Sequence, residues 1–174
     1  MARPTIPPTG IARTWPADRL IVSKTDTKGI ITYANEMFCE VAGYASAELE
    51  GQNHNIIRHP EMPRCVFKLL WDTIAAGEEI FAYVVNQAKT GDHYWVFAHI
   101  TPTFDDGMQI IGYHSSRRVP RSEAVATAKE IYSTLLAIEG RHASPKEGLA
   151  ASMAALAEVL KSKRRDYDEF VFSL

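Results

Sequence analysis

The polar side chains best suited to binding chemistry lie together between Gly51 and Pro63. The candidates in this segment are two imidazoles, a guanidinium, an amide and a carboxylate, carried by His54, Asn55, Arg58, His59 and Glu61. Arg58 can hold a phosphate through two parallel N–H bonds, and His59 can assist when it is protonated. Alternatively, Arg58 and His59 cap short helices or pair with Glu61. The segment therefore predicts either a phosphate contact or a local structural cluster.

The chain shows no pattern that is typical of an enzyme. No nucleophile–base pair, phosphate-cradling glycine loop or metal constellation occurs at a recognisable spacing. His93 and His99 fall on a predicted turn and strand, with no spacing that converges on a metal. Cys39 and Cys65 form no CxxC pair, so both are expected to be reduced, inert thiols. We expect no catalytic residue and no metal site.

Length, net charge and the distribution of apolar residues limit the number of domains and indicate the cellular compartment. A length of 174 residues suits one packed domain with an appendage. A formal charge of −2 argues against a dedicated nucleic-acid binder. No apolar run reaches membrane-spanning length, and Pro4, Pro7 and Pro8 interrupt the region where a signal peptide would be apolar. We therefore expect a cytoplasmic protein without membrane insertion.

Two kinds of periodicity predict the elements that must position these residues. Turn residues separate runs of alternating or β-branched residues, whereas Val66 to Ile74 repeats at helical spacing and ends at Gly77. The expected order is two strands, several short helices and three strands, which predicts an α+β domain with one antiparallel sheet. The predicted strands are 20–22, 30–33, 81–87, 94–104 and 109–117.

The pattern changes to helical after Pro120. One amphipathic helix should end near Gly140, and a second should begin with Ser144 as cap, Pro145 at its first position and Glu147 completing a capping box. The apolar stripe of the second helix either folds back on its own sheet or forms an interface with another copy or a signalling partner. The predicted division is an extended arm at 1–16, a sensory domain at 17–119 and a two-helix segment at 120–174.

Short sequence words within this order resemble those of PAS domains. Residues 29–35, with Phe38 and Gly43-Tyr44, are similar to the PAS opening, and residues 91–95 are similar to the turn between its third and fourth strands. The resemblance implies a PAS fold: a five-stranded antiparallel sheet with short helices on one face, here followed by C-terminal helices.

A more specific resemblance lies in residues 51–63, which are similar to the flavin-binding PAS domains of aerotaxis receptors. Proteins of that family hold FAD and report its redox state to a chemotaxis signalling assembly. The resemblance runs from Leu20 to Arg118 and implies a non-enzymatic sensor with bound FAD. It also implies a signalling partner of the chemoreceptor or kinase type, and we expect a homodimer. The family's membrane anchor and signalling domain are absent from this sequence, so signalling is expected to occur by docking.

The resemblance assigns the flavin environment residue by residue. The family has Asp at the position of Glu61, and a Trp where this chain has Ile80-Phe81. Asn35 has an alternative role as a helix cap, and core packing is an alternative role for Trp71 and Trp95. The residues expected around the flavin or in its supporting shell are Asn35, His54, Asn55, Arg58, His59, Glu61 and Asn86, with Trp71, Phe81, Trp95 and Phe97 as apolar walls.

Three other ligand states remain open. FMN can replace FAD, a haem-based gas sensor can use His54 or His59 as the iron ligand, and a ligand-free PAS module can act through its surfaces alone. Light-sensing relatives carry a reactive cysteine in a Gly-x-Asn-Cys word, but here His54 follows Gly51-Gln52-Asn53. Photochemistry through a cysteinyl adduct is therefore not expected.

Overall fold

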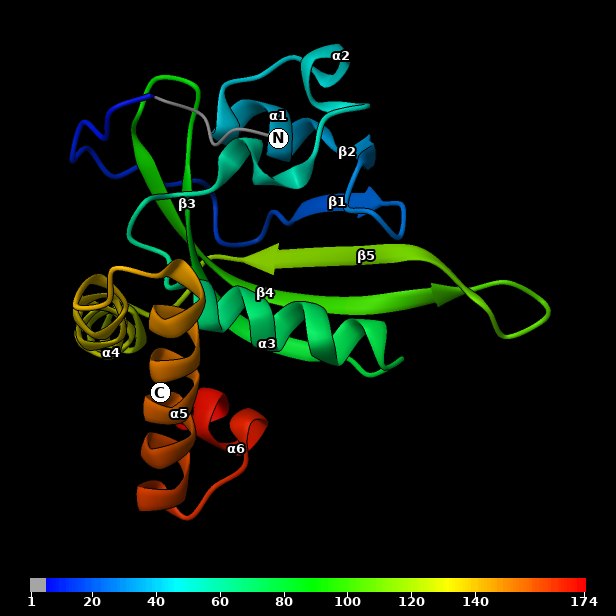
Figure 1. Ribbon diagram of the computed structural model, residues 1–174. Helices are drawn as coiled ribbons and strands as arrows, with labels where there is room; N and C mark the ends of the chain where they lie inside the picture. Colours follow the sequence, from blue (N-terminus) through cyan, green and yellow to red (C-terminus); the bar gives the residue numbers. More distant parts are fainter. Residues whose placement is uncertain (1–5) are drawn as a thin grey trace. The chain divides into compact units, whose positions relative to one another are not determined.

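The computed structural model describes residues 6–174, which form two compact units (Figure 1). The sheet unit consists of residues 6–59 and 73–120, and the helical unit of residues 60–72 and 121–174. The sheet unit ends at Pro120, and residues 60–72 group with the C-terminal helices rather than with the sheet. The elements are β1 (Ile21–Thr25), β2 (Ile31–Ala34), α1 (Glu36–Ala42), α2 (Ser46–Leu49), the 3-10 helix η1 (His54–Ile57), α3 (Arg64–Ala75), β3 (Ile80–Gln87), β4 (His93–Phe104), β5 (Ile110–Arg118), α4 (Ser122–Gly140), α5 (Pro145–Lys163) and α6 (Tyr167–Phe172).

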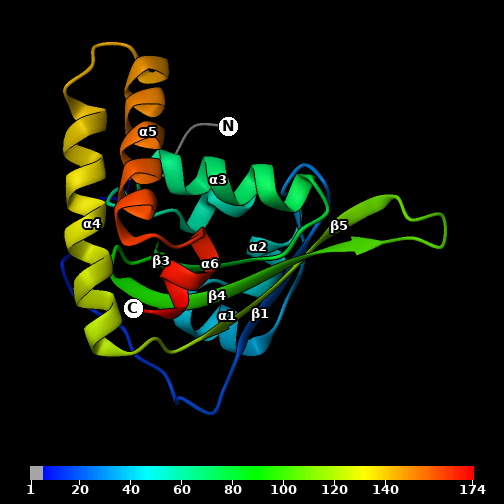
Figure 2. The ribbon, with the colours of Figure 1, turned by 90° about the horizontal axis from the view of Figure 1, so that it is seen from below.

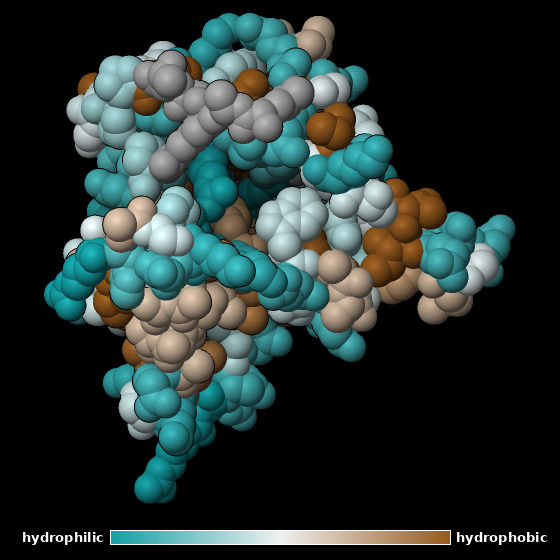
Figure 3. Space-filling view, in the orientation of Figure 1, coloured by the Kyte–Doolittle hydropathy of each residue, from teal (hydrophilic) through white to brown (hydrophobic). Residues whose placement is uncertain are grey.

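The sheet unit is built on one five-stranded sheet, as predicted. Its strand order is β2-β1-β5-β4-β3, and every paired strand is antiparallel. β5 therefore crosses the sheet to lie between β1 and β4. The β4–β5 hairpin is the longest ribbon and extends away from the other strands (Figure 1), and apolar residues reach the surface near it (Figure 3).

Strand alternation divides the central strands into two faces, because successive side chains point to opposite sides of a sheet. On the core face of β3 and β4, each residue of one strand pairs with a residue of the other, and all are buried. These residues are Ile80, Ala82, Val84 and Asn86, opposite Ile100, Ala98, Val96 and Tyr94. The other face carries mainly aromatic side chains, in the pairs Phe81–His99, Tyr83–Phe97 and Val85–Trp95.

The short helices of the sheet unit follow from local capping. Asn35 caps α1 by accepting from the backbone N–H of Phe38, and Gly43 ends the helix at a φ of 73°, in the left-handed region that glycine tolerates best. Phe38, Leu49 and Ile57 from α1, α2 and η1 are fully buried with Ile21 of β1. Together they form the core beside β1 and β2.

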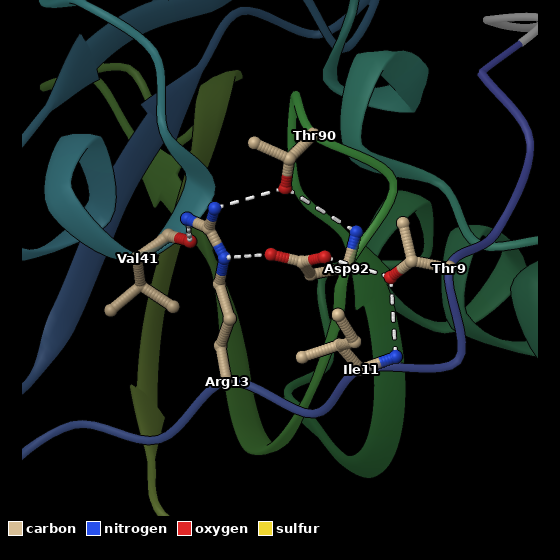
Figure 4. Close-up of polar contacts among 6 residues, drawn as sticks. All are labelled: Thr9, Ile11, Arg13, Val41, Thr90 and Asp92. Atoms are coloured by element: carbon tan, nitrogen blue, oxygen red, sulfur yellow. Dashed lines mark hydrogen bonds and ion pairs between the residues drawn. The ribbon is translucent and has the colours of Figure 1, made fainter.

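The described part of the N-terminal arm is bonded to the sheet unit. The part that the structure describes begins at Ile6, and residues 1–5 of the predicted arm lie outside it. Ala12 forms a parallel bridge with His93, and the backbone N–H of Arg13 donates to the His93 carbonyl over 2.7 Å. The Arg13 side chain adds bonds to Asp92, Thr90 and the Val41 carbonyl (Figure 4). These contacts hold the arm against the start of β4.

The helical unit contains one helix more than the sequence predicts after Pro120. Helices α4 and α5 lie side by side (Figure 2), and Ser144 caps α5 where its sequence indicates. The additional helix, α6, begins with a capping box of Asp166 and Glu169 and buries Phe170 and Val171. Its acidic residues suggest a solvated chain end, which explains why it was missed. None of the described helices has the length and apolarity needed to cross a membrane.

Candidate functional site

A buried polar cluster lies on the core face of the sheet unit. It joins Ser23 of β1, His54 of η1 and Arg117 of β5. Nη2 of Arg117 donates to the hydroxyl of Ser23 and, over 2.7 Å, to Nε2 of His54. The Ser23 hydroxyl also lies 3.2 Å from the same His54 nitrogen. Because β1 and β5 pair Ile21 with Arg117 and Ser23 with Ser115, Ser23 and Arg117 share one face of the sheet.

The electrostatics of this cluster favour a charged arginine and a neutral histidine. Burial and the adjacent charge of Arg117 lower the pKa of His54 to about 3. Burial lowers the pKa of Arg117 to about 10, so its guanidinium stays charged at neutral pH. The Phe38 ring stacks on His54 at 5.8 Å and lies 5.0 Å below the guanidinium carbon of Arg117.

Tyr94 adds a second buried donor to the core face. Its side chain is 0% exposed, and its hydroxyl has no hydrogen-bond partner among residues 6–174. Nη1 of Arg117 is buried without a partner in the same part of the chain. Burial raises the pKa of Tyr94, and the nearby charge of Arg117 opposes that rise, so the hydroxyl stays protonated. Two donors at this face are thus left without acceptors.

Sequence analysis missed Ser23, Tyr94 and Arg117 as site residues. Each lies in a strand with buried residues on the same face. The available signal was a polar side chain at an inward position of an alternating strand. That signal is weak in β5, where polar residues occupy both faces between His114 and Arg118.

The structure brings two predicted site residues together at the edge strand β3. Arg58, which ends η1, forms an antiparallel bridge with Asn86. Asn86 is 4% exposed and pairs with Tyr94, so it lies on the face that carries the polar cluster. His59 is buried next to this bridge, with its ring 5.9 Å from that of His93. The motif between Gly51 and Pro63 is thus joined to strand β3 by a backbone bridge at Arg58.

The side chain of Asn35 forms hydrogen bonds with the backbone of β1 and α1 and of the residue before β1. Its Oδ1 accepts from the N–H groups of Val22 and Phe38, and its Nδ2 donates to the Leu20 carbonyl. The capping role that sequence analysis weighed for Asn35 is therefore present. Asn55 lies half-buried within η1, and its backbone N–H donates to the side chain of Asn53.

The predicted apolar walls do not share a face with Asn86. The register places Phe81 and Trp95 on the opposite side of the sheet, together with Phe97. Phe81 stacks on His99 there, with ring centroids 4.2 Å apart. In this register Phe81 and Trp95 therefore lie on the face of the sheet opposite to that of Asn86. Ile80, which is buried on the Asn86 face, is the apolar residue that the β3 alternation provides.

Two further predicted residues, Glu61 and Trp71, belong to the helical unit. Trp71 is 37% exposed on α3. Within residues 6–174 no group of three or more histidine, cysteine, aspartate or glutamate side chains is arranged to hold a metal ion.

Comparison with known proteins agrees with this architecture. A family model described as the PAS fold matches residues 31–116. The chain is 42% identical over 118 residues to the aerotaxis receptor of Escherichia coli K12, across 68% of this chain and 23% of that protein. It is 32% identical over 97 residues to a nitrogen fixation regulatory protein of Klebsiella pneumoniae, across 56% of this chain and 20% of that protein. The chain thus spans less than a quarter of either relative.

Solved structures share the fold at lower sequence identity. A light-oxygen-voltage domain studied with a flavin analogue superposes with a TM-score of 0.56 at 22% identity, covering 66% of this chain and 87% of that one. The dark structure of the blue-light photoreceptor Aureochrome1 LOV superposes with a TM-score of 0.55 at 21% identity, covering 68% and 86%. From the strand order, the matched family model and the similarity to the aerotaxis receptor, we conclude that this chain contains a domain of the PAS fold.

Proposed function

We propose that this PAS domain binds a flavin, FAD in preference to FMN, and relays redox or oxygen status to a signalling partner. The observation that carries the proposal is the bridge between Arg58 and Asn86, which joins the sequence motif to the polar face of the sheet. The similarity to an aerotaxis receptor supports a flavin as the ligand, and FAD rather than FMN is part of the proposal. In this proposal the chain is a non-enzymatic, cytoplasmic sensor that acts as a homodimer.

The buried polar atoms of the core face fit the chemistry of a flavin. The ring of a flavin has an edge of carbonyl oxygens and nitrogens, and such an edge needs donors. Arg117 and Tyr94 each hold a buried donor without a partner, and the Asn86 amide lies on the same face. In the proposed complex these residues hold the ring edge, whereas Arg58 and His59 hold the phosphates. The bound flavin supplies reversible uptake of electrons.

The proposed signal is a change of hydrogen bonding at the sheet. Asn86 and His54 would exchange hydrogen bonds with a bound flavin ring when its charge and protonation differ between the oxidised and reduced states. Asn86 is part of β3, so its reorientation would bias the position of that strand. We propose that the partner that responds to this shift of β3 is a chemoreceptor or a kinase-type protein.

One contact favours flavin over haem. Iron ligation by histidine uses a ring nitrogen with a free lone pair. In His54, Nε2 already accepts from Arg117, a residue whose charge would repel a ferric ion. Iron ligation through Nε2 of His54 therefore requires this bond to break.

The test is the absorption spectrum of purified protein, followed by dithionite reduction and chromatography of the released chromophore. We expect paired flavin bands that bleach reversibly and release FAD. The variant Asn86→Leu should lose most of the flavin, whereas Gln109→Leu, the same type of change at an exposed position, should retain it. A Soret band would favour haem, and a colourless protein that takes up no added FAD would favour a ligand-free interaction module.

A further inference from the structure

Arg117 is a buried cation that lacks a counter-charge. Its side chain is 3% exposed, and no ion pair joins it to a carboxylate within residues 6–174. Nη2 is satisfied by Ser23 and His54, both of which are neutral, while Nη1 is buried without a partner. A buried charge without a compensating charge is costly to the fold. A cost of this kind points to a function that requires the charge.

Tyr94, in the neighbouring strand β4, carries a second buried hydrogen-bond donor without a partner among residues 6–174. Its hydroxyl is buried without a partner, and its aromatic ring meets Trp15 of the N-terminal arm edge-on at 6.2 Å. Tyr94 shares one face of β4 with Ala98, and Ala98 pairs with Arg117, so the two side chains lie on the same side of the sheet. An N–H and an O–H donor on the same face of adjacent strands, both shielded from water, form the kind of site that stabilises an oxygen carrying negative charge.

We propose that Nη1 of Arg117 and the Tyr94 hydroxyl form a subsite for a negatively charged ring oxygen of a planar ligand, and that they stabilise the reduced, anionic form of a bound flavin. The inference rests on the proposed function. Uptake of two electrons and one proton converts the neutral oxidised ring to an anion. In the test below dithionite supplies the electrons and is itself oxidised, and water supplies the proton. Ser23 and His54 are positioning residues, because they orient the guanidinium through Nη2.

The subsite should act on the reduced ring more strongly than on the oxidised ring. Its removal therefore lowers the two-electron reduction potential of the bound flavin. A tenfold loss of preference for the reduced form corresponds to about 30 mV for a two-electron couple. We expect Arg117→Met to lower the potential by at least about 30 mV, and Tyr94→Phe to lower it by a smaller amount.

A merely structural role for Arg117 predicts a different result in the absence of ligand. Arg117 has no counter-charge among the described residues, so replacing it by an apolar side chain of similar length removes the desolvation cost of a buried charge. After removal of the flavin, Arg117→Met should therefore unfold at the same temperature as the unsubstituted chain or at a higher one. If Arg117 served only to join Ser23 and His54, its loss should lower that temperature and leave the potential unchanged.

The experiment measures reduction potential by dithionite titration, and the melting temperature of the flavin-free protein, for the full chain and its variants. Arg118→Met is the matched control, because Arg118 is the next residue of β5 and is exposed. Lower potentials in Arg117→Met and Tyr94→Phe, with an unchanged Arg118→Met, support the subsite. Since the Tyr94 hydroxyl has no partner, Tyr94→Phe keeps the test valid if Arg117→Met does not fold.

Two negative outcomes have different meanings. If the unsubstituted chain binds FAD but Arg117→Met and Tyr94→Phe have the potential of the Arg118→Met control, the subsite is overturned and the proposed function stands. If the unsubstituted chain takes up no FAD, the proposed function is overturned, and the subsite with it.

Discussion

Nη2 of Arg117 lies 2.7 Å from Nε2 of His54, and this distance determines the protonation state of the histidine. Arginine can only donate, so Nε2 must be the acceptor and the single ring proton must lie on Nδ1. The bond also joins η1 to β5 across a separation of 63 residues. The histidine at the centre of the sequence motif is thus held neutral by a residue of the last strand.

The depressed pKa of His54 predicts acid-sensitive stability. In the unfolded chain a histidine titrates near pH 6.5, but in the folded protein the pKa is about 3, so the unfolded state binds more protons between these values. The contribution of His54 to stability is therefore complete above pH 6.5 and is lost as pH falls toward 3. Urea unfolding at pH 7.5 and pH 5.0 should show a smaller acid loss in His54→Gln than in the unsubstituted chain. The control His142→Gln replaces an exposed histidine, and an equal acid loss in all three proteins would contradict the prediction.

The Arg13–Asp92 ion pair predicts that the N-terminal arm can be released by one substitution. Nε of Arg13 lies 2.9 Å from the carboxylate, which also accepts from Thr9 over 2.7 Å (Figure 4). In Arg13→Ala we expect the backbone N–H of residue 13, now without its anchor, to exchange hydrogen severalfold faster. Hydrogen–deuterium exchange of residues 9–13 is the measurement.

Two further variants separate arm release from general destabilisation. Arg19→Ala removes longer, exposed ion pairs to Glu36 and Glu40, both at 3.6 Å, and should leave exchange in residues 9–13 unchanged. Gly91→Ala should release the arm by another route, because a Cβ there would lie 2.4 Å from the Pro7 carbonyl oxygen. Exchange that rises equally in Arg19→Ala would argue against a specific anchor.

Glu139 is predicted to hold the helical unit together. Its carboxylate is buried and accepts from Nε of Arg64, the backbone N–H of Cys65 and the hydroxyl of Ser152, at 2.9, 3.1 and 3.0 Å. Glu139→Ala leaves these donors without an acceptor, which should lower the free energy of unfolding of this unit by about 2–3 kcal/mol. Chemical denaturation followed by helical circular dichroism measures the loss. The exposed Glu130→Ala on the same helix is the control, and a comparable loss there would count against the network.

Met108 is predicted to be a site of backbone strain. It follows the Asp105–Gly107 turn of the β4–β5 hairpin with a φ of 60°, a conformation that costs a residue with a Cβ about 1–2 kcal/mol. Its side chain is 72% exposed, so little packing is lost on substitution. Met108→Gly should therefore raise the melting temperature of the sheet unit relative to Met108→Ala, which keeps the Cβ. Equal melting temperatures would show that the turn is not strained.

Local chemistry made much of the fold predictable. The cap at Ser144-Pro145 and the stop at Gly43 act within one helical turn, and the observed helices begin and end at these residues. Turn residues such as Asp105–Gly107 likewise separated the strands correctly. Strand alternation could also have shown that Phe81 and Asn86, five positions apart, lie on opposite faces of β3. That signal was present in the sequence and was overlooked.

Short-range spacing was sufficient to predict the order of elements, the PAS class and the motif from His54 to Glu61. The assembled sheet was needed to show that Ser23, His54, Tyr94 and Arg117 lie at one face. Ser23 and Arg117 are 94 positions apart and meet only after β5 has inserted between β1 and β4. The strand register that joins them depends on pairing between distant segments, and neither residue type nor local period specifies such pairing.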